Sequence, residues 1–172
     1  GFLRLAAGRG IGGWLHGGGQ EGGRRAGTEN LPSILSMVAV LEHLTTHELQ
    51  GSGSREVIRR TFEADLKASI PSIRIVGEEA DRLWNTVSVI LPAGENSRWV
   101  ARLDRLGFEV STGSACATGA EAPSHVLGAL GLEPTEARRV IRISSGWSTK
   151  PEDWEALRAA LAGLVAEEGN LP

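Results

Sequence analysis

The sequence predicts an α/β protein in which a small α+β domain follows a glycine-rich segment and a long helix. Three observations support this prediction. From residue 52 onward, short apolar runs typical of strands alternate with longer runs in which apolar residues recur every three or four positions. Residues 29–50 show the helical period alone, and glycine dominates residues 17–23. Alternating strands and helices favour a layered fold in which helices cover a sheet.

Composition limits the classes of function. The 172 residues are 41% hydrophobic and carry a net charge of −3, so the chain can bury a core. Its basic residues are scattered and mostly arginine, and we expect no nucleic-acid partner. A single cysteine cannot form an internal disulfide, which favours a reducing, cytoplasmic setting. No apolar run approaches the roughly 20 residues that cross a bilayer, so we expect no membrane association. Because the chain begins without Met, we expect a piece of a longer polypeptide.

The first elements expected are a short strand at residues 2–5 and a loop at residues 17–23. Several glycines of that loop need a positive φ, and the loop lacks the Lys-Ser/Thr ending of a phosphate-binding P-loop. A helix follows, with Thr28 or Asn30 as its cap and Pro32 in its first turn. Its apolar stripe consists of Leu31, Ile34, Leu35, Val38 and Leu41.

The start of this helix also suits an anion. Backbone N–H groups, the Thr28 hydroxyl and the nearby Arg24 and Arg25 are all donors. An ordinary cap with solvated arginines explains the same residues, and the residues alone favour that simpler interpretation.

The remaining elements follow in order. An amphipathic helix runs from Val57 to Ile70 and ends at Pro71. The pair Thr149 and Glu152 forms the capping box of the last helix. Between them we expect strands at 73–76, 86–91, 108–110 and 140–144, helices at 97–106 and 124–130, and a helical turn from 135.

Residues 111–120 (STGSACATGA) contain the only cysteine, Cys116, among small residues that cannot build a core. A lone thiol between a strand and a helix suits a reactive nucleophile, and an inert surface thiol fits equally well. His125 follows at the start of the next helix, where a histidine is more often solvated than catalytic.

Arg142 lies in the middle of a predicted strand and faces opposite to Ile141 and Ile143. An arginine there either binds an anion, such as a carboxylate, or faces water on an edge strand. His43 and His47 have helical metal-ligand spacing but no evident third ligand, so we expect no metal site.

Three segments in this order resemble one family. They are residues 16–21 (HGGGQE) with 25–28 (RAGT), residues 111–116 (STGSAC) with 123–127 (PSHVL), and residues 141–144 (IRIS) with Gly146. Together they are similar to the C-terminal half of the pyridoxal-phosphate-dependent cysteine desulfurases of the class V aminotransferases, in the branch with the longer cysteine loop. The Asn85-Thr86 pair before a strand also matches the family pattern.

The resemblance implies the C-terminal part of a pyridoxal-phosphate-dependent transferase of fold type I. Residues 1–28 would be the tail of the large cofactor domain, residues 29–50 a linking helix, and residues 51–172 the small domain with the cysteine loop. The implied activity removes sulfur from L-cysteine and leaves alanine.

The resemblance also implies residue roles. Cys116 would take the sulfur as a persulfide and pass it to an iron–sulfur scaffold or a thiolation partner. Arg142 would bind the substrate carboxylate, and Thr28 would donate to the cofactor phosphate across the interface of a homodimer. His125 has no role in this pattern.

Several residues depart from the family pattern. The lysine that holds the cofactor precedes the first residue of this chain, and neither Lys67 nor Lys150 has its context. Gly22 replaces an arginine, Trp84 a proline and Trp147 an arginine. We therefore expect that this chain alone does not hold pyridoxal phosphate covalently.

Three alternatives to an active desulfurase stay open. The chain is an inert truncated form, or a domain that only accepts sulfur or docks a partner. The third alternative is a related class V lyase that acts on another amino acid without a persulfide.

Overall fold

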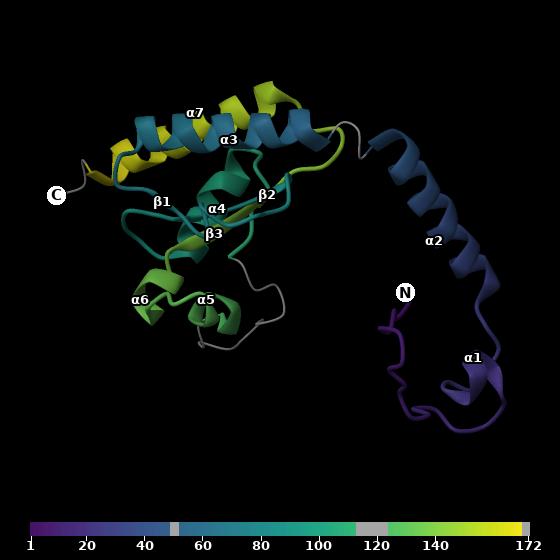
Figure 1. Ribbon diagram of the computed structural model, residues 1–172. Coiled ribbons are helices and arrows are strands. Elements are labelled where there is room, and N and C mark those ends of the chain that lie inside the picture. Colours follow the sequence, from purple (N-terminus) through teal and green to yellow (C-terminus); the bar gives the residue numbers. More distant parts are fainter. Residues whose placement is uncertain (49–51, 113–123, 170–172) are drawn as a thin grey trace. The chain divides into compact units, whose positions relative to one another are not determined.

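A computed structural model describes residues 1–48, 52–112 and 124–169 (Figure 1). The chain divides into two compact units, Gly1–Gly51 and Ser52–Pro172, and each is considered by itself. Within the described residues, no helix is long and apolar enough to cross a membrane.

The first unit contains α1 (Gln20–Gly23), α2 (Leu31–His43) and the π-helix η1 (Leu44–Glu48). The strand expected at residues 2–5 is not formed, so that prediction was wrong. A short extended segment is stable only when it pairs with another strand, and residues 2–5 form no ladder with other described residues.

The glycine-rich loop has the left-handed backbone that its sequence predicts. Gly22, Gly23 and Gly27 have φ values of 65°, 76° and 97°. Glu21 shares this conformation with a φ of 52°, although it is not a glycine.

The cap of α2 is Asn30, one of the two residues predicted for it. Its Oδ1 accepts a hydrogen bond from the Ser33 backbone N–H at 3.1 Å, and Pro32 lies in the first turn. The helix continues into η1 rather than running as one regular α-helix to residue 50. None of its residues is buried, and its apolar stripe is exposed.

The second unit is an α+β domain with a three-stranded antiparallel sheet in the order β1-β2-β3. Its elements are α3 (Ser52–Ser69), β1 (Arg74–Ile75), β2 (Thr86–Ile90), α4 (Asn96–Arg105), α5 (His125–Ala129), α6 (Pro134–Ala137), β3 (Val140–Ser144) and α7 (Pro151–Gly169).

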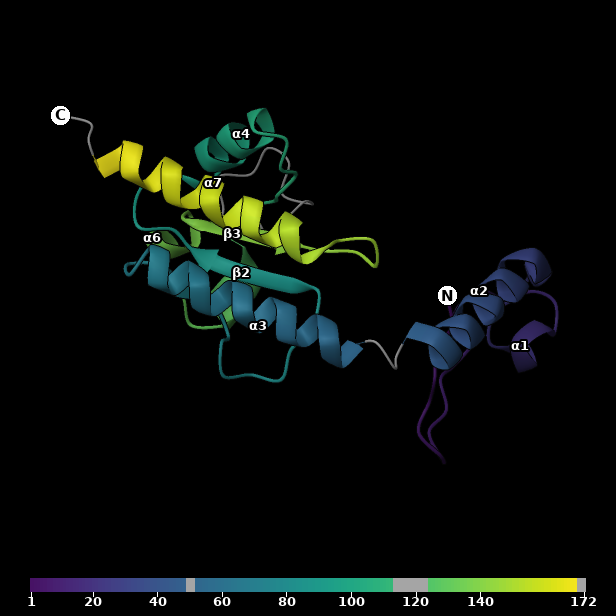
Figure 2. The same ribbon diagram turned by 90° about the horizontal axis from the view of Figure 1, so that it is seen from above.

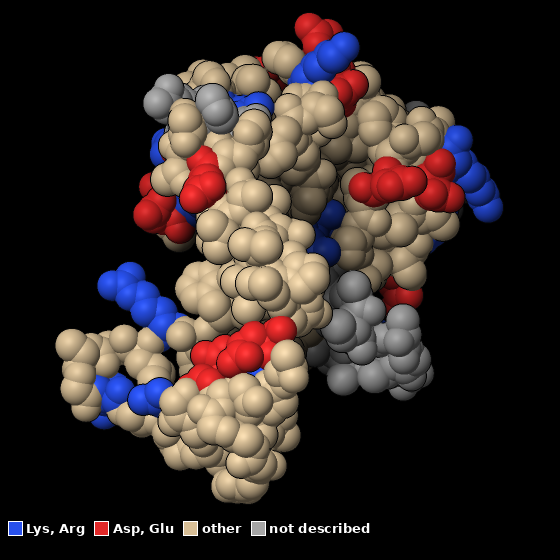
Figure 3. All heavy atoms as spheres, turned by 90° about the vertical axis from the view of Figure 1, so that its right-hand side faces the viewer, with Lys and Arg blue, Asp and Glu red and all other residues tan. Residues whose placement is uncertain are grey.

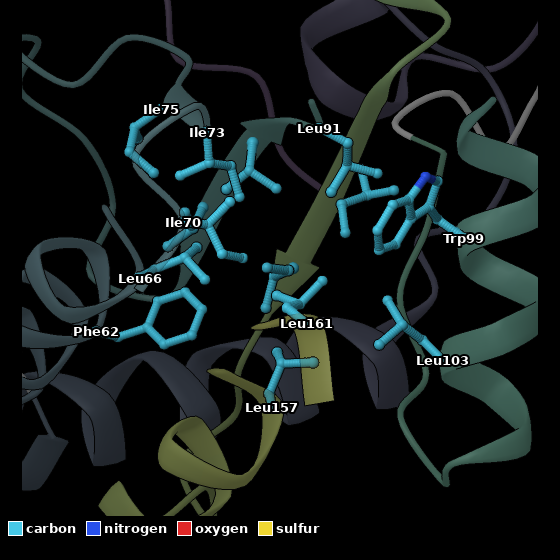
Figure 4. Close-up of a cluster of buried hydrophobic side chains, with 14 of the residues drawn as sticks. Phe62, Leu66, Ile70, Ile73, Ile75, Leu91, Trp99, Leu103, Leu157 and Leu161 are labelled. Carbon is cyan, nitrogen blue, oxygen red and sulfur yellow. The ribbon is translucent and has the colours of Figure 1, made fainter. Parts of the chain in front are cut away.

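One face of the sheet carries the main core. Val87 and Val89 of β2 and Ile141 and Ile143 of β3 are buried here because alternate strand residues share a face. The helices α3 and α7 run side by side over the sheet, as Figures 1 and 2 show. Figure 4 shows how these helices and α4 fill the core, with Phe62, Leu66, Trp99, Leu103, Leu157 and Leu161.

The opposite face is covered at one end only. Ile90 and Val140, which are register partners, form a second cluster with Leu127 of α5 and Ala137 of α6. The rest of this face carries polar residues, so it is the face on which a functional site can form.

Two predictions about the segments that flank β3 require correction. Residues 108–110 form no strand, and only Ser111 forms a bridge to the sheet. At the start of α7, the Lys150 N–H donates to Asp153 Oδ2 at 2.8 Å. The reciprocal cap is therefore formed one residue later than the pair Thr149 and Glu152 predicts. The Thr149 hydroxyl instead accepts a hydrogen bond from the Gly146 N–H at 2.9 Å.

A buried charge cluster fastens the loop before β2 to α3. Glu63 Oε1 and Oε2 accept hydrogen bonds from Arg59 Nη1 at 2.8 and 3.0 Å, and Arg82 Nη2 donates to Oε2 at 3.1 Å. Most other charges lie on the surface, where Figure 3 shows basic side chains interspersed with acidic ones on one face.

Candidate functional site

Arg142 lies at the centre of β3, on the partly open face of the sheet. Its register partner on β2 is Ser88, and cross-strand partners project from the same face. Both residues are half-buried, whereas Ile141 and Ile143 are buried in the core on the other face. The facing predicted for Arg142 from the alternation of its strand is confirmed.

Ser111 pairs with Arg142 on the side of β3 that faces away from β2. The Ser111 N–H donates to Arg142 O at 3.0 Å, and the Arg142 N–H donates to Ser111 O at 2.7 Å. The Arg142 backbone is therefore bracketed by Ser88 on one side and Ser111 on the other, and Arg142 is not on a free edge at this point.

The cysteine segment is anchored to the second unit at both ends. Its first residue, Ser111, bridges Arg142, and Leu127 of α5 beyond it packs on Ile90 and Val140. Cys116 itself lies outside the described residues. A pocket of about 150 Å³ lies beside this arrangement, between residues 107–110 and β3. A larger pocket of about 410 Å³, between α4 and the end of α7, contains none of these residues.

Thr28 lies in the first unit, in the segment that precedes α2. The Asn30 side chain caps the helix, so the exposed Thr28 hydroxyl is not used for this purpose. The Arg25 guanidinium donates to Gly27 O at 2.7 Å and lies 3.6 Å from Glu21, so it is held beside this turn. The donor set predicted at the helix start is therefore present.

The sequence matches the profile of the class V aminotransferases over residues 17–157. The chain belongs to the aminotransferase class-V family. It is 39% identical to a cysteine desulfurase from Cereibacter sphaeroides over 80% of this chain and 35% of the relative. It is 34% identical to one from Rhodobacter capsulatus over 92% of this chain and 41% of the relative. The cysteine desulfurase NifS of Azotobacter vinelandii is 31% identical over 91% of this chain and 39% of that protein.

Solved structures of class V relatives show the same fold. A NifS-like protein superposes with a TM-score of 0.76 at 26% identity, covering 95% of this chain and 41% of that protein. A NifS-like protein from Rickettsia africae superposes with a TM-score of 0.71 at 26% identity, covering 92% of this chain and 41% of that protein. The fold is therefore that of part of a type I pyridoxal-phosphate enzyme, and the predicted fold class is confirmed. The chain spans about two fifths of the length of these relatives.

The two lysines do not suit covalent attachment of the family cofactor. A Schiff base requires a neutral amine. A hydrogen bond from Lys67 Nζ to Glu78 at 2.6 Å raises the pKa of the Lys67 ammonium above its usual value, so Lys67 stays charged. Lys150 is exposed beside the start of α7. The Thr28 hydroxyl, in contrast, is the type of donor that a cofactor phosphate accepts.

Two of the three departures from the family pattern contact each other. The ring centroids of Trp84 and Trp147 are 4.7 Å apart, with the planes tilted by 46°. Arg55 of α3 lies over both rings. The sequence shows these two residues as separate changes, since 62 residues lie between them.

Ser88 is a site residue that the sequence reasoning missed. The signal was present, because Thr86, Ser88 and Ile90 alternate with the buried Val87 and Val89. His125 is exposed at the start of α5. Within the described ranges, no group of three His, Cys, Asp or Glu residues suits a metal ion.

Proposed function

We propose that this chain supplies the sulfur-accepting and carboxylate-binding part of a pyridoxal-phosphate-dependent cysteine desulfurase. The observation that supports it best is the backbone pairing of Ser111 with Arg142, since this pairing joins the start of the cysteine segment to the strand of the arginine. Similarity to named cysteine desulfurases over most of the chain supports the same activity.

Arg142 binds the α-carboxylate of L-cysteine in this proposal. A guanidinium offers two parallel N–H donors that match the two oxygens of a carboxylate. The Arg142 backbone is held on both sides, so its side chain starts from a fixed place on the open sheet face.

Cys116 is the nucleophile. Its thiolate attacks the sulfur of the bound substrate, and an S–S bond forms while the substrate C–S bond breaks. The electron pair of that bond stays on the substrate carbon, which then takes a proton and becomes the methyl group of alanine. The persulfide on Cys116 then passes its outer sulfur to an acceptor, which we propose is an iron–sulfur scaffold or a thiolation partner.

Pyridoxal phosphate, when bound, supplies the electron sink that weakens the substrate C–S bond. Thr28 donates its hydroxyl to the cofactor phosphate, and we propose that it does so in the site of the other protomer of a homodimer. The division into a cofactor-domain tail at 1–28, a linking helix at 29–50 and a small domain at 51–172 is part of the same proposal. Because the reaction needs a free thiol, we place it in a reducing compartment, the cytoplasm.

Turnover measurements separate this proposal from its alternatives. We expect no alanine from L-cysteine and pyridoxal phosphate with this chain alone, because Lys67 is a charged ion-pair partner. Joined to the lysine-bearing half of a class V relative, the chain should release alanine. Alanine release that does not depend on Cys116 would favour a different class V lyase, and no release would favour an inert or docking domain.

The thiol gives a second test that needs no turnover. Cys116 is the only cysteine, so alkylation of the chain reports on this residue alone. A thiol that acts as a nucleophile should alkylate rapidly near neutral pH because its pKa is lowered. An incidental surface thiol should instead react at the rate of a small free thiol.

A further inference from the structure

Three side chains form a cluster at one end of the sheet, which we call the aromatic clamp: Arg55, Trp84 and Trp147. The Arg55 guanidinium carbon lies 4.4 Å from the Trp147 ring centroid and 5.3 Å from that of Trp84. Arg55 Nη2 also donates to the Trp147 carbonyl at 3.4 Å. Both distances from the guanidinium to the rings lie within the range of cation–π attraction.

The clamp lies where β2 begins and β3 ends. Trp84 comes just before β2, and Trp147 comes just after β3. Between these points the Ser145 N–H donates to Asn85 O at 2.9 Å and extends the ladder by one pair. The two rings therefore meet across the same strand pair that carries Ser88 and Arg142.

Alternation of apolar residues does not fix the register of these strands completely. A slip of one residue is excluded by burial, because it would turn Arg142 into the core. A slip of two residues keeps every side chain on its own face. It moves one strand along the other by about 6.8 Å, at about 3.4 Å per residue. The 4.7 Å contact between the two rings does not survive such a shift.

Burial alone does not explain the clamp. Trp147 is 41% exposed, and Arg55 and Trp84 are only half-buried, so these residues are not part of the core. What they do is join three chain segments, the first turns of α3, the entry to β2 and the exit from β3. At the opposite end, Ile90 and Val140 are covered by Leu127.

We propose that the aromatic clamp fixes the register of β2 against β3 and thereby holds Arg142 opposite Ser88. Arg55, Trp84 and Trp147 are then positioning residues that act through the strand pair. The inference rests on the proposed function only for the role given to Arg142, since the register can be measured without substrate.

The experiment is nuclear magnetic resonance on the full chain. Arg142 and Ser88 form a pair without mutual backbone hydrogen bonds, because both Arg142 groups bond Ser111, so their Cα atoms lie close together. A contact between the two Hα protons thus reports the register. We expect Trp147→Ala and Trp84→Ala to weaken this contact. We also expect amide exchange at Val87, Ile143 and Ser145 to rise about tenfold, the effect of losing one aromatic pair.

Conservative and matched variants separate positioning from general destabilisation. Trp147→Phe keeps an aromatic contact and should restore the Ser88–Arg142 contact. Arg55→Leu removes only the cation and should give the same local pattern to a smaller degree if Trp147→Ala does not fold. Phe62→Leu, in the main core, should raise exchange throughout the domain without changing the register contact.

An unchanged register contact in Trp147→Ala and Arg55→Leu, or exchange that rises uniformly as in Phe62→Leu, would overturn the inference. Failure of the proposed function is a separate result. It would show as unchanged turnover in Arg142→Ala, whatever the register measurement gives.

Discussion

Replacing Glu63 with Gln tests how the loop before β2 is held. The Glu63 carboxylate serves two guanidinium groups, with Arg59 Nη1 at 2.8 and 3.0 Å and Arg82 Nη2 at 3.1 Å. The side chains of Arg59 and Glu63 are 3% and 6% exposed, so solvent does not replace the lost charge. Removing one partner of a buried pair costs about 3–5 kcal/mol, because the remaining charge stays buried without compensation.

The assay is urea denaturation of the full chain, compared with Glu155→Gln. Glu155 pairs with Arg158 at the surface, where loss of an ion pair costs at most about 1 kcal/mol. We expect Glu63→Gln to lower the free energy of unfolding of the second unit by at least three times as much as Glu155→Gln. Equal effects of the two variants would refute the reasoning, because Glu63 would then carry no more weight than a solvated pair.

Three further predictions concern the helix cap, the acid range and the substrate arginine. Asn30→Ala should cost about 0.5–2 kcal/mol of helix stability, measured by amide exchange at Ser33, because the cap bond is lost; unchanged exchange would contradict this assignment. The hydrogen bond from Arg158 lowers the pKa of Glu155, so its stabilisation is present above the ordinary carboxyl pKa and is lost as pH falls through the lowered value. The stability difference between wild type and Glu155→Gln should therefore vanish in acid, and a difference that persists there would have another cause. In the joined enzyme, Arg142→Lys should raise KM for L-cysteine about ten- to hundredfold by losing one charge-assisted hydrogen bond, and an unchanged KM would remove the carboxylate role.

Local patterns in the sequence predict much of the second unit. Strict alternation predicts the strands at 86–91 and 140–144, and it assigns Arg142 to the correct face. Helical spacing predicts the helix that ends before Pro71. These signals succeed because each depends only on which face of a single element is buried.

The failures involve partners that lie far away in the sequence. Residues 2–5 have the composition of a strand but no strand to pair with, and residues 108–110 approach β3 at a single bridge. The shift of the α7 cap to Lys150 and Asp153 reflects competition between two adjacent polar residues for the same helix start.

The site shows the same limit. The pairing of Ser111 with Arg142 and the contact of Trp84 with Trp147 are both created by the antiparallel sheet. No periodicity within one element indicates either contact. The resemblance to a known family suggested that the cysteine segment and Arg142 act together, and the bridge at Ser111 gives that suggestion a physical basis.

The most direct measurement is the mass of the Cys116 peptide after a single turnover. The chain is joined to a lysine-bearing cofactor half, loaded with pyridoxal phosphate and mixed with L-cysteine in the absence of any acceptor. We expect the Cys116 peptide to gain the mass of one sulfur atom in step with the first equivalent of alanine, and Cys116→Ser to release no alanine. An unmodified Cys116 peptide beside a full equivalent of alanine would contradict the proposed transfer to this residue.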